Sequence, residues 1–181
     1  GYFFPKGLGP ISGIFAQNKS YAQLFKKLGY EEAKIFISGN IKYDSLVNVK
    51  KADFALNGKL VQLTKGRLVI TLGSTRPGEE LLLLNGLKRL LQMFPKLLVV
   101  VAPRHPKRAR EVSSMFASNG FKVQFSSTAG ELDFSDNVLI VDSLGILNFY
   151  YQVSNLAFVG GSLLPYGGHN VMEPCFQGVP T

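Results

Sequence analysis

The sequence predicts an α/β fold in which helices cover both faces of a doubly wound parallel sheet. Two observations support this prediction. From residue 67 onward, short β-rich runs alternate with longer helix-like segments, which is the order of elements in a sheet built from βαβ units. The run KLLVVVA at residues 96–102 is apolar almost throughout, as expected for a strand buried on both faces.

The first three elements of this region are predicted from their composition and from the residues at their ends. Residues 67–73 (RLVITLG) are expected to form a buried strand, and residues 79–94 are long enough for four helical turns. Ser74 or Thr75 is expected to cap that helix, and Glu79 and Glu80 suit its first turn because carboxylates favour the positive end of the helix dipole. Residues 96–102 then form the second strand.

The remaining elements alternate in the same way. Gly120 marks the end of the next helix, since glycine readily adopts the conformation that terminates one. The expected elements after residue 102 are a helix at 106–119, strands at 121–125 and 137–141, a helix at 144–154, a strand at 156–159 and a short helix at 170–176.

The chain divides into three regions. Residues 1–44 contain a strand-like run at 13–16, a helix-like run at 21–28 and a second strand at 34–38, which suggests the end of a preceding αβ domain. Residues 45–66 are the expected linker, and residues 67–181 are the second domain. The last residues, 179–181, look like the approach to one more strand, so we expect this domain to be truncated.

Composition excludes several classes of protein. The 181 residues are 46% hydrophobic and 18% charged, which is typical of a folded domain and not of a disordered chain. No apolar run approaches the roughly 20 residues of a transmembrane helix. A single cysteine excludes an internal disulfide, and two histidines are too few to suggest a His-based metal site. The sequence has no Asp-x-Asp, P-loop or dinucleotide-binding fingerprint, so we expect a metal-free protein in a reducing, cytoplasmic setting.

The charge is unevenly distributed. Residues 1–110 hold 19 of the 20 Lys and Arg but only six of the twelve acids. This excess suggests a surface that meets phosphates on nucleic acid, nucleotide or anionic lipid, although a solvated basic face explains it equally well.

Ligands of open parallel sheets bind beyond the carboxyl ends of the strands, so a binding site is expected in the loops that follow the strands. Arg104 follows the second strand in a turn stiffened by two prolines, and a guanidinium can hold a phosphate or carboxylate with two hydrogen bonds. Asp142, Ser143 and Gly145 follow a later strand. An ordinary helix cap accounts for this second loop just as well.

The most informative loop is residues 160–174, GGSLLPYGGHNVMEP. Two glycine pairs surround a proline-containing segment, and the second pair leads into a helix that carries Asn170 and Glu173. Free amides at a helix N-terminus bind anions, and glycines let a ligand approach the backbone. Two tight turns are the alternative, but turns alone do not require His, Asn and Glu together.

Four stretches, in order, resemble the family of 3-deoxy-D-manno-octulosonic acid (Kdo) transferases. They are residues 39–44 (GNIKYD), 73–80 (GSTRPGEE), 103–106 (PRHP) and 160–174. The resemblance covers essentially the whole chain. It implies the GT-B fold of two Rossmann-like domains, with this chain spanning the end of the N-terminal domain, the linker and most of the C-terminal, donor-binding domain.

The resemblance also implies an activity: transfer of Kdo from CMP-Kdo to a hydroxyl of a lipid A precursor, with inversion and without a metal or other cofactor. It implies a location at the cytoplasmic face of the bacterial inner membrane, with anionic lipid and not nucleic acid as the partner surface. Lys42 falls where the family has a cation that stabilises the transition state. The family's general base, a glutamate of the N-terminal domain, is not in this chain, so we expect the fragment to be inactive alone. The positions implied to bind CMP are Pro103, Arg104, Leu144, Gly145, Ile146, Gly168, Asn170, Val171, Met172 and Glu173.

Three positions depart from the family pattern. Arg76 stands where many members have His, and Ser143 and Ile146 replace the more usual Thr and Glu. Backbone contacts from residues 144–146 survive such changes, whereas a side-chain contact from Ile146 does not. The alternatives are another GT-B enzyme, a transferase or epimerase that uses a UDP-sugar, and, from a different class, a nucleic-acid-binding module without catalysis.

Overall fold

The computed structural model describes residues 11–40, 60–62, 64–128 and 135–181. The chain forms two compact units, Gly1–Lys50 and Lys51–Thr181. The expected linker at residues 45–66 lies mostly outside the described residues.

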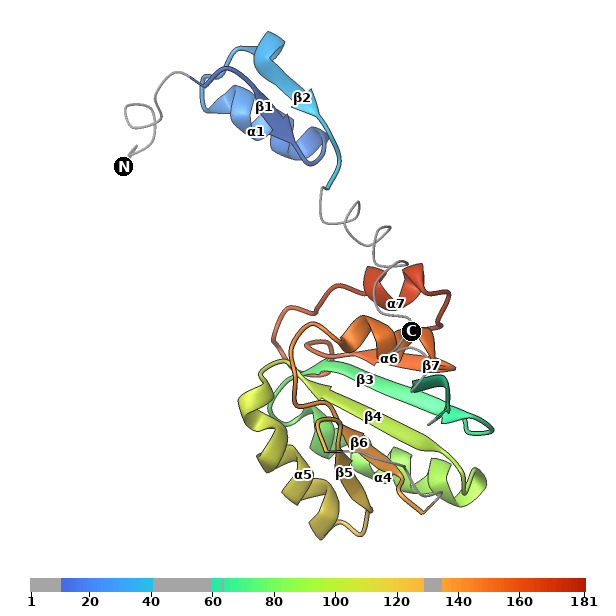
Figure 1. The fold of residues 1–181 in the computed structure, drawn as a ribbon. Coiled ribbons are helices and arrows are strands. Elements are labelled where there is room, and N and C mark those ends of the chain that lie inside the picture. Colours follow the sequence, from blue (N-terminus) through green and yellow to red (C-terminus); the bar gives the residue numbers. More distant parts are fainter. Residues whose placement is uncertain (1–10, 41–59, 63, 129–134) are drawn as a thin grey trace. The chain divides into compact units, whose positions relative to one another are not determined.

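The first unit contains one βαβ arrangement (Figure 1). Strand β1 (Ile14–Ala16) pairs in parallel with β2 (Ile35–Ile37), and helix α1 (Lys19–Lys27) connects them, followed by the 3₁₀ turn η1 (Glu32–Lys34). Asn18 caps α1, because its side-chain oxygen accepts a hydrogen bond of 3.0 Å from the Tyr21 amide. The helix therefore begins two residues before the expected 21–28 segment.

The second unit is built on a five-stranded parallel sheet in the order β5-β6-β4-β3-β7. Its strands are β3 (Val69–Thr75), β4 (Leu98–Pro103), β5 (Val123–Phe125), β6 (Val138–Ile140) and β7 (Leu156–Val159). The central strands β3 and β4 pair from Val69 with Leu98 to Thr75 with Pro103. After β6 the chain crosses to the far side of β3 and forms β7. Because all five strands are parallel, the loops that follow β3, β4, β6 and β7 lie at the same carboxyl edge of the sheet.

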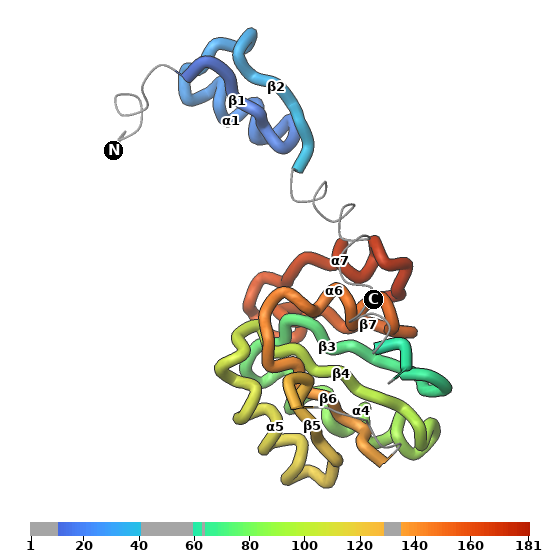
Figure 2. The backbone as a smooth tube through the Cα atoms, in the orientation of Figure 1, coloured from blue at the N-terminus to red at the C-terminus, as the bar shows by residue number. Residues whose placement is uncertain are grey.

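Helices cover both faces of this sheet (Figures 1 and 2). Helices α4 (Glu79–Met93) and α5 (Ala109–Ser118) lie on one face, and α6 (Leu147–Gln152) lies on the other with α7 (Met172–Phe176) beside it. Alternate residues of β4 divide between the two faces: Val99 and Val101 pack with α4 and α5, whereas Val100 and Ala102 pack with α6. This alternation confirms the predicted doubly wound parallel sheet.

Several predicted boundaries are wrong, each for a local reason. The segment at 106–119 begins with the 3₁₀ turn η3 (Pro106–Arg108) before α5. Helix α6 starts at Leu147 instead of 144, because Gly145 has φ +83 and interrupts a helical path. Neither Ser74 nor Thr75 caps α4, whose N-cap is Gly78 without a side-chain hydrogen bond.

Within the described residues, no helix has both the length and the apolar character needed to cross a membrane.

Candidate nucleotide-binding site

A cavity of about 270 Å³ opens at the carboxyl ends of β3, β4 and β6. Five of the positions expected to bind CMP line it: Pro103, Arg104, Leu144, Gly145 and Glu173. Ser74, Ala102, Pro106, Val141, Ser143, Leu147 and Asn148 complete its wall. The cavity thus combines apolar side chains with one cation and one acid, which suits a ligand that carries both a planar ring and a charge.

The end of the β3–β4 pair positions Arg104. The Arg104 amide donates a hydrogen bond of 3.0 Å to the carbonyl of Thr75, so the residue remains attached to β3 although its side chain is exposed. Ser74 beside it has φ 55, a left-handed conformation that non-glycine residues seldom adopt. Backbone strain of this kind is concentrated at ligand sites, and here it shapes the rim of the cavity.

Gly160 permits this geometry. A Cβ atom at position 160 would lie 2.3 Å from the Ser74 carbonyl oxygen and 2.6 Å from the Thr75 Cα. Only a residue without a side chain allows β7 to end so close to β3.

Glu173 reaches the cavity from α7 and is partly buried. Burial raises the pKa of its carboxyl above the ordinary glutamate value, and the attraction of Arg104 opposes that rise. Burial also raises the pKa of the Tyr151 hydroxyl, and the charge of Glu173 adds to that effect. Glu173 is therefore an acid whose oxygens are partly desolvated, a state suited to accepting hydrogen bonds from ligand hydroxyls.

The loop before α6 lines the cavity with Leu144 and Gly145 but not with Ile146. Leu144 and Gly145 line the cavity, whereas Ile146 packs against the core beneath α6. Asp142 does not cap α6: its carboxylate accepts hydrogen bonds from the hydroxyls of Ser126 and Ser127, at 2.7 and 2.5 Å. These bonds tie the loop after β6 to the loop after β5.

The start of α7 differs from the prediction. The helix begins at Met172 instead of 170, and the Asn170 side chain accepts a hydrogen bond of 3.0 Å from the Met172 amide. The Asn170 side chain thus pairs with a backbone amide that was expected, from the sequence, to be free for an anion. Gly168, Asn170, Val171 and Met172 are not among the residues that line the cavity. Lys42 lies outside the described residues.

Sequence reasoning missed Asn148. It lies on α6 and lines the cavity, and its buried Oδ1 accepts no hydrogen bond from any described residue. A buried acceptor without a partner is unfavourable unless a ligand or water satisfies it. Its position, one residue after Leu147, could not be identified as a binding position from the sequence, because asparagine also occurs commonly on the exposed side of a helix.

Sequence reasoning also missed the structural role of Glu79, which is fully buried. Its two carboxylate oxygens accept hydrogen bonds of 2.8 to 3.0 Å from four backbone amides, those of Arg76, Gly161, Ser162 and Leu163. Burial alone would raise the pKa of this carboxyl, but the four amides outweigh it and hold the pKa below the ordinary value. Glu79 therefore fixes the loop after β7 to the start of α4.

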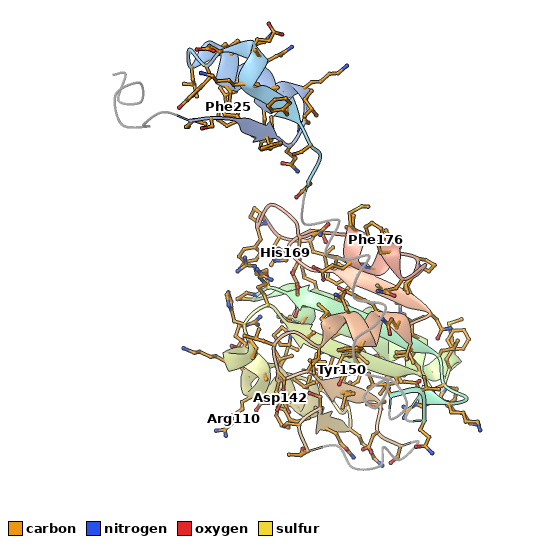
Figure 3. All side chains as sticks on the ribbon, turned by 45° about the horizontal axis from the view of Figure 1, so that its top comes forward. Phe25, Arg110, Asp142, Tyr150, His169 and Phe176 are labelled. Atoms are coloured by element: carbon orange, nitrogen blue, oxygen red, sulfur yellow. The ribbon has the colours of Figure 1, made fainter. Side chains whose placement is uncertain are left out.

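Both histidines of the chain contact Arg76. The Arg76 Nε donates to the His169 Nε2 at 3.1 Å, and its Nη1 lies 3.4 Å from the His105 Nε2. The guanidinium also lies over the Tyr166 ring, 5.4 Å from its centroid. Figure 3 shows His169 on the loop that leads into α7. Burial lowers the pKa of His169, and the positive charges of Arg76 and Arg104 lower it further, against an opposing effect of Glu79.

Across the residues that the structure describes, no three His, Cys, Asp or Glu side chains come close enough together to hold a metal ion.

No family model matches the sequence. The chain is 37% identical over 175 residues to the 3-deoxy-D-manno-octulosonic acid transferase of Haemophilus influenzae, covering 94% of this chain and 40% of that protein. It is 33% identical over 185 residues to the enzyme of the same name from Chlamydia muridarum, covering 99% of this chain and 42% of that protein. The chain thus spans about two fifths of the length of these relatives.

A solved structure agrees with the sequence relatives. The C-terminal CMP-Kdo binding domain of WaaA from Acinetobacter baumannii superposes with a TM-score of 0.65 at 36% identity, over 71% of this chain and 70% of that one. This likeness confirms the expected Rossmann-like fold of GT-B type. With the parallel sheet and the cavity at its carboxyl edge, it establishes that the chain belongs to the family of 3-deoxy-D-manno-octulosonic acid transferases.

Proposed function

We propose that this chain is the donor-binding part of a glycosyltransferase that moves Kdo from CMP-Kdo to a hydroxyl of a lipid A precursor. The observation that carries the proposal is the cavity at the carboxyl ends of β3, β4 and β6, lined by Arg104 and Glu173. It occurs in a chain that resembles a solved CMP-Kdo binding domain over most of that domain's length.

Each wall of the cavity fits one part of CMP. The apolar side chains of Ala102, Val141 and Leu147 offer a surface for a planar base. Arg104 carries a fork of donors for the phosphate, and the Glu173 carboxylate can accept hydrogen bonds from the ribose hydroxyls. Gly145, without a side chain, lets the ligand approach the loop backbone.

The same groups suit the reaction. When the bond between Kdo and CMP breaks, negative charge develops on the leaving phosphate, and a cation already held in place stabilises that charge. Arg104 supplies this cation in the cavity, and Lys42 is a second candidate from the resemblance. The acceptor hydroxyl must also lose its proton to a general base. We propose the family's N-terminal glutamate for that step, and an inverting, metal-free reaction.

We further propose that the protein acts at the cytoplasmic face of the bacterial inner membrane, with its basic surface against anionic lipid. Support comes from the excess of Lys and Arg in residues 1–110. In the structure Lys26 and Lys34 form ion pairs with Glu32 and Glu31, which offset part of that charge. The test is binding of the complete protein to anionic and neutral vesicles, with Lys26, Lys27 and Lys34 changed to Glu. Preference for anionic vesicles, lost in the variant, is expected; equal binding to both would contradict the proposal.

The donor assignment is tested by titration calorimetry of CMP, UMP and UDP in the presence of EDTA. We expect CMP to bind most tightly without a metal. Because a hydrogen bond to a charged group contributes about 1.5 to 3 kcal/mol, Arg104→Ala is expected to weaken CMP binding by about 10- to 100-fold. Glu173→Ala removes the proposed ribose acceptor and should also weaken it. Arg89→Ala, at an exposed position of α4 away from the cavity, is the matched control.

Two other results would contradict this assignment. A preference for UDP would indicate a UDP-sugar enzyme. Binding of nucleic acid in place of mononucleotides, with steep salt dependence, would indicate a nucleic-acid module.

A further inference from the structure

A cluster of nitrogen-bearing side chains around one guanidinium lies beside the cavity and is not explained by binding of the nucleotide. We define it as Arg76, His105 and His169, which follow β3, β4 and β7 respectively. Arg76 is central, with its Nε at 3.1 Å from the His169 ring nitrogen and its Nη1 at 3.4 Å from that of His105. Three loops far apart in the sequence thus bring their nitrogen-bearing side chains together at one edge of the sheet.

No carboxylate balances this cluster within the described residues. The ion pairs among the described residues involve neither Arg76 nor Arg104. Glu79 is the acid whose charge acts on His169, but both of its oxygens already accept hydrogen bonds from backbone amides. The guanidinium of Arg76 therefore keeps donors available for an anion from outside the chain.

The cluster and the cavity are close enough to share one ligand. Arg104 lines the cavity and also acts electrostatically on His169. The carbonyl of Thr75, next to Arg76 in the chain, accepts the amide hydrogen of Arg104 at 3.0 Å. A ligand whose phosphate meets Arg104 can therefore extend a second group toward Arg76.

We propose that the cluster of Arg76, His105 and His169 binds the carboxylate of the donor's sugar. The inference rests on the proposed function. An octulosonic acid linked to CMP carries two separate negative charges, the phosphodiester and the sugar carboxylate, and the structure offers two separate guanidinium groups. Arg104 receives the phosphate, and Arg76 receives the carboxylate through the two-pronged contact that guanidinium and carboxylate favour. The neutral sugar of most UDP-sugars would leave the cluster unpaired, so the cluster selects for an acidic sugar.

The test compares three ligands on the 181-residue chain by titration calorimetry at low salt: CMP, freshly prepared CMP-Kdo and the methyl ester of CMP-Kdo, which lacks the second charge. We expect wild type to bind the acid about tenfold more tightly than the ester. Arg76→Gln is expected to reduce that ratio to about twofold or less while the Kd of CMP stays within about twofold of wild type. Arg89→Gln removes an exposed positive charge elsewhere and should leave both the ratio and the CMP affinity unchanged.

The outcomes separate this inference from the proposed function. If CMP binds but acid and ester bind equally, or if Arg76→Gln keeps the preference for the acid, the cluster is not a carboxylate site and only this inference fails. If no form of the chain binds CMP, both fail. A phosphate of the acceptor is the other anion that the cluster could bind, and glucosamine 4-phosphate is the probe for it. The inference would also be overturned if this probe bound to CMP-saturated wild type but not to Arg76→Gln, and wild type showed no preference for the acid over the ester.

Discussion

Burial raises the pKa of Glu173, so the folded chain holds the proton of this carboxyl more tightly than the unfolded chain does. The stability that this protonation contributes is complete below the unfolded pKa and is lost as pH rises through the higher folded pKa. The ionised form of Glu173 is therefore the less favourable one for the fold. The same ionised form is the one that we propose accepts hydrogen bonds from ribose.

The first prediction follows from this opposition. Glu173→Gln is expected to raise the melting temperature at pH 7 and to weaken CMP binding by about tenfold, which corresponds to one charge-assisted hydrogen bond. In wild type, CMP affinity should fall on acidification at a pH above the ordinary glutamate pKa. Thermal unfolding and calorimetry between pH 4.5 and pH 8, with the exposed Glu111→Gln as control, measure both effects. A variant that is destabilised at pH 7 would show that Glu173 has a structural role instead.

A pair of glycines gives the second prediction. Gly160→Ala would place a Cβ 2.3 Å from a backbone oxygen of β3, and this overpacking should cost about 1 to 3 kcal/mol. Gly86→Ala on α4 adds a Cβ that meets nothing within 4 Å and should stabilise the helix by about 0.5 to 1 kcal/mol. Urea denaturation followed by circular dichroism compares them. Equal effects of the two changes would mean that β3 and β7 do not approach as described.

At the scale of elements, Glu79 joins α4 to the loop between β7 and α7. Since the four amide donors face a carboxylate, Glu79→Gln would turn an NH₂ group toward at least one N–H. The expected loss is about 2 to 4 kcal/mol of unfolding free energy, together with faster amide hydrogen exchange at Gly161 to Leu163. The lowered pKa of Glu79 means that its contribution is present above the unfolded pKa and is lost as pH falls through the folded one.

The test of this third prediction is therefore also a pH series. The difference in stability between wild type and Glu79→Gln should be constant near neutrality and should shrink only at a pH below the ordinary glutamate range. Glu111→Gln, which loses an exposed ion pair with Arg108, should change stability by less than about 1 kcal/mol. A similar effect of the two substitutions would contradict the role assigned to Glu79.

The order of elements could be predicted from sequence because it depends on local patterns. The apolar run of β4 and the glycine after α5 identify those elements without any tertiary information. The exact start of α6 could not be predicted, because Leu144 and Ile146 suit a helix and only the positive φ of Gly145 interrupts it. The start of α7 was missed for a related reason. Asn170 bonds to the Met172 amide instead of forming the first turn of the helix, and which of these two positions it takes depends on the conformation of the whole loop.

At the scale of the whole molecule, some residues of the site could be predicted from the sequence and others could not. Arg104 and Glu173 could be anticipated because parallel strands bring their carboxyl ends to one edge, whatever the details of packing. Asn148 and the contact between Arg76 and both histidines depend on side-chain geometry across loops that are 29 and 93 residues apart. No spacing rule covers such distances, so these groups become visible only in the folded chain.

A second cavity, of about 340 Å³, lies between α5 and the loops after β5 and β6. It is lined by Lys107, Arg110, Ser127 and Asp142 among others, and Arg110 and Asp142 are labelled in Figure 3. Its two basic side chains make it the natural competitor for a phosphate-bearing ligand. Neither size nor the presence of an acid decides between the two cavities, because each is lined by one carboxylate, Glu173 in the first and Asp142 in the second.

The most direct test of the account is to map CMP onto the chain by nuclear magnetic resonance, following backbone amide shifts during a metal-free titration. Binding in the first cavity predicts saturable shifts at Arg104, Leu144, Gly145 and Glu173, with Lys107 and Ser127 unaffected. Shifts confined to Lys107, Arg110 and Ser127, or no shifts at CMP concentrations in the millimolar range, would contradict the claim that this edge of the sheet is the nucleotide site.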